Sequence, residues 1–227
     1  MIIELIGLPG CGKSHISVLL AERLRNAGIP ASEPSRRIGH GRPLPRLAAK
    51  SACALAFLLL HPINTIRTVL AVAHTRQTSL KNLAKSLFNL LFVRGLFVLF
   101  PRKNRVVLLD QGLVQGCASV HFSASRPLAQ GFLASLPVPE LVLRIRADQE
   151  TVIRRLGKRV TGAGSRVEEN PAEQLSRYAE ALESLTDRPP LEVAEIIEIW
   201  NNGNGENLNQ ELDAVVEKIV QMYKSSR

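Results

Sequence analysis

The chain has 227 residues, of which 45% are hydrophobic and 22% are charged. This composition excludes a wholly disordered chain and suffices for one ordinary domain with its own core. The 29 lysines and arginines outnumber the 20 acidic residues and give a net charge of +9, which favours anionic partners such as nucleotides, nucleic acid or an acidic membrane surface.

The first forty residues predict a strand, a helix and a second strand. Residues 2–6 form an apolar run followed at once by glycines, which is typical of a buried strand. Apolar residues at helical spacing predict a helix over 13–27, which Gly28 ends. A second strand is expected at 29–33. The Gly-, Pro- and Arg-rich stretch at 36–45 is expected to be a loop.

Residues 47–100 are unusually apolar and have a helical pattern. One helix is expected to end at residue 61, a second to begin at Pro62, and a third to span 79–100. The apolar stretches 47–60 and 83–100 are too short or too interrupted by lysine and arginine to cross a bilayer, so we expect no transmembrane segment.

The rest of the chain returns to alternating strands and helices. Strands are expected at 105–109, 141–145 and 194–200, and helices at 149–159, 171–185 and 208–223. This alternation predicts a single α/β domain over residues 1–227, with a five-stranded parallel sheet between helical layers. Residues 40–104 then form a helical insertion between the second and third strands.

Cysteine and histidine usage indicates the setting. The three cysteines form no C-x-x-C pair, and the five histidines show no metal-ligand spacing. We therefore expect a reducing, cytoplasmic environment, no zinc held by the protein and, since no basic stretch precedes the apolar N-terminal run, no signal peptide.

A complete G-x-x-x-x-G-K-[ST] motif follows the first predicted strand and opens the first predicted helix. In this context the glycines let backbone N–H groups curl around phosphate oxygens, Lys13 reaches the β- and γ-phosphates, and the Ser14 hydroxyl ligates Mg²⁺. The pattern therefore predicts a nucleoside triphosphate site. The expected nucleotide-binding loop contains Gly7, Pro9, Gly10, Cys11, Gly12, Lys13, Ser14 and His15.

Asp110 ends the strand expected at 105–109. A carboxylate there, beside the first strand, suits either a water-mediated magnesium ligand or a contact to a substrate hydroxyl, and the sequence leaves both open. Because no Asn-Lys-x-Asp guanine-reading motif occurs, ATP is favoured over GTP as the cofactor.

Four segments of the chain together resemble the thymidylate kinase-like group of P-loop nucleoside and nucleotide kinases. They are the motif at residues 7–14, which we call the phosphate loop, the strand ending in Asp110, the segment LVLRIRADQETVIRRLGKR and the late segment IIEIWNNG. The resemblance covers roughly residues 1–34 and 105–223, and matches 40–104 only weakly. It implies a three-layer P-loop NTPase fold and ATP- and Mg²⁺-dependent transfer of the γ-phosphoryl group to a small acceptor.

The resemblance also implies an arginine-containing lid, here residues 155–168. Its arginines would clamp the phosphates and neutralise developing charge. The matching candidates are Arg155, Arg159 and Arg166, while Asn202 and Gly203 fall in the turn that lies against adenine in these enzymes.

Acceptor-side residues follow from the same resemblance. Glu33 in the Glu-Pro pair after the second strand is the candidate general base or acceptor ligand, with Arg36 and Arg37 as neighbouring contacts. These kinases usually follow the third-strand Asp with Arg, where this chain has Gln111. Phe92 and Arg94 are the nearest candidates for base stacking and base reading.

Residues 40–104 would set acceptor choice in such a kinase. Apolar stripes at helical spacing most often face a core, so packing within the domain is the leading interpretation of their apolar excess. A homodimer face and a peripheral membrane contact stay open as alternatives.

A nucleotide or nucleoside is the first acceptor to expect. The alternatives are a sugar or a lipid-linked glycan precursor, handled at a membrane surface, and a P-loop ATPase that acts through a partner. Nucleic-acid binding is disfavoured because few aromatic residues accompany the basic charge.

Overall fold

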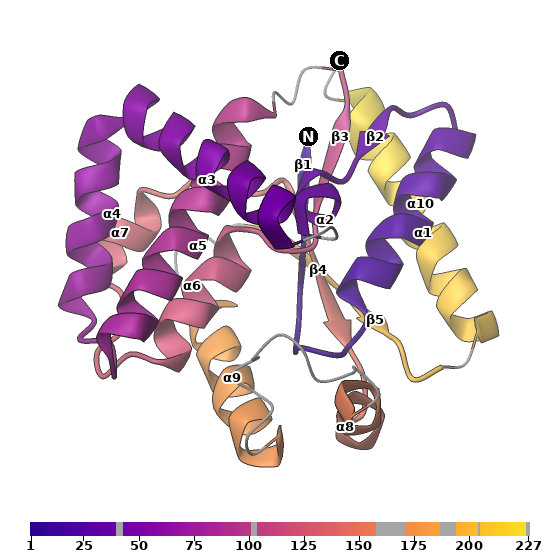
Figure 1. The fold of residues 1–227 in the computed structure, drawn as a ribbon. Coiled ribbons are helices and arrows are strands. Elements are labelled where there is room, and N and C mark those ends of the chain that lie inside the picture. Colours follow the sequence, from indigo (N-terminus) through magenta and orange to yellow (C-terminus); the bar gives the residue numbers. More distant parts are fainter. Residues whose placement is uncertain (40–42, 101–103, 158–170, 187–193, 204, 226–227) are drawn as a thin grey trace.

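The computed structural model describes residues 1–39, 43–100, 104–157, 171–186, 194–203 and 205–225. Five strands form one sheet in the order β2-β3-β1-β4-β5, and every neighbouring pair is parallel. This confirms the expected α/β fold with a five-stranded parallel sheet (Figure 1). The strands are β1 (Ile2–Ile6), β2 (Ala31–Ser32), β3 (Val106–Leu109), β4 (Leu141–Arg146) and β5 (Glu195–Trp200).

The sheet has one apolar cluster on each face, because alternate residues of a strand point to opposite sides. In β1, Ile2 and Ile6 join one cluster, whereas Ile3 and Leu5 join the other. All five residues of β1 are buried, as expected for a strand at the centre of a covered parallel sheet.

Helices α1 (Lys13–Asn26), α8 (Gln149–Gly157) and α10 (Gly205–Ser225) contribute to the cluster on one face. On the other face, α5 (Leu80–Leu99), α6 (Leu113–Phe122), α7 (Gln130–Ala134) and α9 (Pro171–Thr186) contribute to the second cluster. Figure 1 shows α1 and α10 on one side of the sheet and α4 to α7 on the other.

The insertion between β2 and β3 consists of α2 (Pro34–Gly39), α3 (Pro43–Leu60), α4 (Pro62–His74) and α5. Part of the predicted loop at 36–45 is therefore helical. The predicted helix boundaries at Pro62 and near Ser79 are confirmed, and the Ser79 hydroxyl caps α5 by accepting from the Asn82 backbone N–H at 3.1 Å.

Helix α3 packs closely along α5. A Cβ atom added at Gly95 of α5 would lie 2.0 Å from the Cys53 carbonyl oxygen of α3, so only glycine fits at this crossing. The buried side chains of Cys53 and Phe57 face the same contact. The two helices therefore behave as one packed unit.

The expected core packing of the insertion is only partly correct. Leu90 of α5 is buried, but Ile63, Ile66 and Leu70 of α4 are exposed, together with all six leucines of α3. Helical spacing shows that these residues share a face, but it does not show which way that face points.

Helices α3 and α5 are both long and apolar enough to cross a membrane by length and composition. Helix α3 begins earlier than the expected residue 47 and so reaches 18 residues. Length therefore does not exclude that these helices span a membrane. Core helices of soluble proteins pass the same test, however, and 39% of the 18-residue apolar stretch of α5 is buried.

Candidate active site

The phosphate loop connects β1 to α1, and three of its glycines have positive φ angles. The φ angle is +90° at Gly10 and +103° at Gly12, a conformation that other residues rarely adopt. A Cβ atom at Gly12 would also lie 2.1 Å from the Asn201 side-chain amide. The loop shape thus depends on glycine at the positions where the motif requires it.

The Lys13 ammonium group folds over the loop. Its Nζ donates to the Gly7 carbonyl at 2.7 Å and to the Leu8 carbonyl at 2.9 Å. Lys13 is also the first residue of α1, so its charge lies beside the N-terminal N–H groups of that helix. Cation and helix end together create a strong anion-binding position.

Asp110 is held in place by two serines. The Ser14 hydroxyl donates to Oδ2 and the Ser35 hydroxyl donates to Oδ1, both at 2.6 Å, and the Asp110 backbone N–H donates to the Ser35 oxygen at 3.1 Å. The carboxylate is therefore oriented from both sides, directly beside the phosphate loop.

This oxygen pair fits a magnesium ion. When Ser14 donates its proton to Asp110, the lone pairs of Oγ stay free for a hard cation, and the carboxylate lies within reach of that cation's water shell. Within the described residues, no group of three or more His, Cys, Asp or Glu side chains could hold a metal. Magnesium at a phosphate loop needs few protein ligands, because the nucleotide phosphates supply others.

Two residues from distant parts of the chain brace the loop. The Cys11 carbonyl accepts from the Asn201 side chain at 2.8 Å and from Arg155 at 3.3 Å, and Arg155 also donates to the Asn201 oxygen. Asn201 is buried at the end of β5. The end of β5 and helix α8 therefore help to fix the phosphate loop.

The predicted adenine-side residues lie close to this brace. The Asn202 oxygen accepts from the Asp148 backbone N–H at 2.8 Å, just before α8, and Gly203 has a φ angle of +96°. The buried residue at this turn is Asn201, and Asn202 is exposed.

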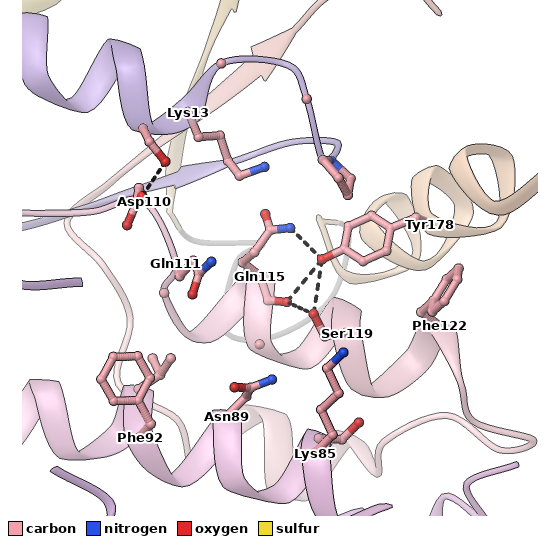
Figure 2. A pocket seen from close by; sticks show the side chains of 18 of the residues that line it. Lys13, Lys85, Asn89, Phe92, Asp110, Gln111, Gln115, Ser119, Phe122 and Tyr178 are labelled. Carbon is pink, nitrogen blue, oxygen red and sulfur yellow. Dashed lines mark hydrogen bonds between the residues drawn. The ribbon is translucent and has the colours of Figure 1, made fainter. Parts of the chain in front are cut away.

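A cavity of about 460 Å³ extends from the phosphate loop to helices α5, α6 and α9. Pro9, Gly10, Gly12, Lys13, Ser14 and His15 line one end, next to Asp110 and Gln111. Figure 2 shows Lys85, Asn89 and Phe92 of α5 across the cavity from Lys13. A volume of this size accommodates a small acceptor beside a terminal phosphate.

The far end of the cavity is mostly neutral and polar. Asn89, Ser119 and Tyr178 line it, and Lys85 adds a cation. The buried Phe92 ring forms an apolar patch there, with the Lys50 ammonium 4.8 Å from its centre. Burial lowers the pKa of Lys50, and nearby Arg46 lowers it further.

Gln115 joins the cavity wall to the phosphate loop. Its Oε1 accepts from the Gly7 N–H at 3.2 Å, while its amide nitrogen donates to the Tyr178 hydroxyl, which lies 3.2 Å from Ser119 (Figure 2). Burial raises the pKa of Tyr178 to about 12, so its hydroxyl stays protonated. A chain of hydrogen bonds thus runs from the loop to α9.

Several residues predicted for the acceptor side do not line the cavity. Glu33 is buried and forms ion pairs with Arg25 at 3.2 Å and with Arg36 at 4.0 Å. Because these cations neutralise the Glu33 carboxylate away from the cavity lining, its placement as a base facing the acceptor is not supported. Arg37, like Arg36, lies in α2 outside that lining.

The expected acceptor contact from Arg94 is wrong. Arg94 is buried among the insertion helices, where it donates to the Thr68 hydroxyl at 2.9 Å and lies 4.7 Å from the centre of the Phe57 ring. Burial lowers the pKa of its guanidinium. Arg94 therefore connects α3, α4 and α5 instead of reading an acceptor.

Residues 155–157 of the predicted lid are described, and Arg155 donates a hydrogen bond to the Cys11 carbonyl of the phosphate loop. Arg159, Arg166 and the rest of the lid to residue 168 lie outside the described residues. Their predicted roles stay predictions.

Sequence reasoning missed several residues of this site because nothing local marks them. They come from strands and helices that only the fold brings together. Helical spacing from Lys85 to Asn89 and from Gln115 to Ser119 could have suggested two polar helix faces. The missed residues are Ser35, Lys50, Lys85, Asn89, Gln115, Ser119, Tyr178 and Asn201.

Comparison with known proteins supports the fold. No protein-family model matches the chain, and no curated protein matches it. Among solved structures, a thymidylate kinase from Ehrlichia chaffeensis is similar with a TM-score of 0.54 at 15% sequence identity, covering 96% of this chain and 98% of that one. This likeness shows a P-loop kinase-like fold.

Proposed function

We propose that the protein is an ATP- and Mg²⁺-dependent phosphotransferase, and that its acceptor is a nucleoside monophosphate. The single observation that carries this proposal is the continuity between a complete phosphate loop and the cavity behind it. Lys13, Ser14 and Asp110 line the same cavity as Asn89 and Phe92 of the insertion. A triphosphate and an acceptor can therefore meet at one point.

Transfer in such a site depends on position and charge. Lys13 and the N-terminus of α1 would hold the β- and γ-phosphates, while Gln115 and Asn201 keep the loop in its shape through Gly7 and Cys11. Ser14 and Asp110 would hold Mg²⁺, which neutralises charge that develops on the phosphates during transfer.

The charge of the cavity favours a phosphate acceptor over a hydroxyl acceptor. A hydroxyl needs a base to take its proton, and Asp110 is the one carboxylate among the described residues that line the cavity. Both of its oxygens already accept from serines. A phosphate monoester is largely ionised at neutral pH and needs no base, and Lys85 offers it a cation.

The first experiment measures ADP release from Mg·ATP with a panel of nucleoside monophosphates, nucleosides and sugars. We expect a monophosphate to stimulate release. The Lys13→Ala variant should lose at least about 100-fold of that activity, because it removes a preorganised cation at the transferred group. Its far-ultraviolet circular dichroism should match the wild type, since Lys13 is only partly buried and belongs to neither apolar cluster.

A second pair of variants tests the acceptor side. Lys85→Ala should raise the KM for the acceptor several-fold with little change in the KM for ATP. Lys81→Ala, one turn earlier on α5 and outside the cavity lining, is the matched control and should change neither value.

Full activity in Lys13→Ala, or stimulation by sugars alone, would contradict the proposal.

A further inference from the structure

Helix α4 has polar residues on its inward face and large apolar residues on its outward face. Its inward face contains two threonines, Thr65 and Thr68, beside the buried Val72, and the Thr68 hydroxyl accepts from buried Arg94. Its outward face contains Ile63, which is 68% exposed, and Ile66, which is 59% exposed. A helix in water normally shows the opposite arrangement, so this outward face suits an apolar surrounding.

The exposed face continues onto α3 across the short connection at His61. Leu55, Leu58, Leu59 and Leu60 are each at least 44% exposed. Helix α4 lies at the outer edge of the molecule, on the side away from α1 and α10, and α3 runs from beside α2 out to the start of α4 (Figure 1). We call Leu55, Leu58, Leu59, Leu60, Ile63 and Ile66 the apolar corner. Exposed apolar side chains concentrated on two consecutive helices are typical of a binding surface.

The segment of the chain that contains the apolar corner carries charge almost entirely of one sign. Residues 34–139 contain 14 lysines and arginines but a single acidic residue, Asp110, which faces the phosphate loop. The rest of the chain carries a net charge of −4, so the entire positive excess belongs to this segment. Arg67 lies beside Ile63 and Ile66 on α4 and is exposed.

We propose that the apolar corner binds the surface of an anionic lipid bilayer. Its leucines and isoleucines would enter the boundary between headgroups and acyl chains, while Arg67 beside them contacts lipid phosphates and carboxylates. A second copy of the chain is a poor occupant, because it would bring the same positive surface against this one.

The packing of α3 favours a helix that lies on the membrane over one that crosses it. Its inward face is fixed to α5 through Cys53 at Gly95, and Phe57 lies under Arg94. Helix α5 in turn supplies Lys85 and Asn89 to the cavity. Only the outward face of α3 is therefore available to lipid.

Co-sedimentation with vesicles tests this proposal. We expect binding to phosphatidylcholine vesicles that contain about one quarter phosphatidylserine, and at least about tenfold weaker binding to phosphatidylcholine alone. The double variant Ile63→Asn/Ile66→Asn should lose at least about tenfold in affinity. The control Ile153→Asn alters an exposed isoleucine on α8 and should bind like the wild type.

A second pair of variants tests the contribution of charge to vesicle binding. Arg67→Glu and Lys224→Glu change the net charge equally, but Lys224 lies at the end of α10, away from the insertion. Only Arg67→Glu should weaken binding. Raising the salt from about 0.1 M to about 1 M should also release the protein, because the screening length falls to about 3 Å.

Three outcomes would overturn the proposal. Equal binding to neutral and anionic vesicles would contradict the role of charge. Retention on vesicles at high salt and alkaline pH would indicate a spanning helix. A stable dimer in light scattering, dissociated by Ile63→Asn/Ile66→Asn and accompanied by no vesicle binding, would assign the corner to a second copy.

Discussion

Glu4 is a carboxyl group buried inside the central strand, next to the candidate active site. Its Oε1 accepts from the Gln115 backbone N–H at 2.9 Å, while its Oε2 has no hydrogen-bond partner among the described residues. Gly112 leaves room for it, since a Cβ there would lie 2.2 Å from the Glu4 carboxyl carbon. Burial raises the Glu4 pKa to about 7, although N–H groups of α6 partly offset this rise.

This raised pKa makes the stability of the protein depend on pH. The folded pKa lies above the unfolded value, so the contribution of Glu4 is complete below about pH 4.5 and is lost as the pH rises through about 7. The loss amounts to about 3 kcal/mol of unfolding free energy. Urea unfolding at about pH 5 and about pH 8 should show Glu4→Gln gaining that amount over the wild type at the higher pH.

The control for this prediction is Glu206→Gln, an exposed glutamate in the first turn of α10. It should shift the unfolding free energy little and equally at both pH values. If Glu4→Gln behaved in the same way, the Glu4 carboxyl would be ionised without cost in the folded protein.

At the scale of elements, local signals predicted most of the sheet and the boundaries that proline or a capping serine marks. The phosphate loop was accessible because a strand, a glycine loop and a helix are adjacent in sequence, and Asp110 was accessible because it directly follows an apolar strand. Ser35 and Asn201 were not, since they reach the loop only through strand order. The direction in which α4 faces was also inaccessible, because periodicity is the same for a buried and an exposed stripe.

The contact between α3 and α5 carries a prediction for Gly95→Ala. The added methyl group would meet the Cys53 carbonyl oxygen at 2.0 Å, so the helices must separate. We expect a loss of about 1–3 kcal/mol in the free energy of unfolding, measured with urea. Gly131→Ala in α7 is the matched control, because nothing lies within 4 Å of its added Cβ and alanine favours helix.

A stability of Gly95→Ala equal to that of Gly131→Ala would mean that the two helices tolerate a wider spacing. In that case α3 would not be fixed to α5, and faces of α3 other than the outward one would be available to lipid.

At the scale of the whole molecule, the cavity joins three parts of the chain that are far apart in sequence. The phosphate loop supplies Lys13 and Ser14, the insertion supplies Asn89 and Phe92, and α9 supplies Tyr178. A ligand that fills the cavity contacts all three parts. Its binding should therefore stabilise the folded chain as a unit.

Mg·ATP at about 100 times its dissociation constant should add about 2.7 kcal/mol to the free energy of unfolding. For a chain of this size we expect a rise in Tm of roughly 5–10 °C, measured by scanning calorimetry. Gly12→Ala should abolish the rise, since its methyl group would displace Asn201 and distort the loop. A similar rise with Gly12→Ala would place the nucleotide elsewhere.

The positive excess lies in residues 34–139, and helices α4 to α7 of this segment lie on the side of the sheet opposite α1 and α10 (Figure 1), so we expect the molecule to have a dipole moment across the sheet. In the field of an anionic plane, such a dipole experiences a torque that turns the insertion toward the plane before any contact forms. Within about one screening length of the plane, near 10 Å at moderate salt, the molecule therefore needs less time to reach the orientation in which it binds. The net charge of +9 alone, spread evenly, would attract the molecule without orienting it.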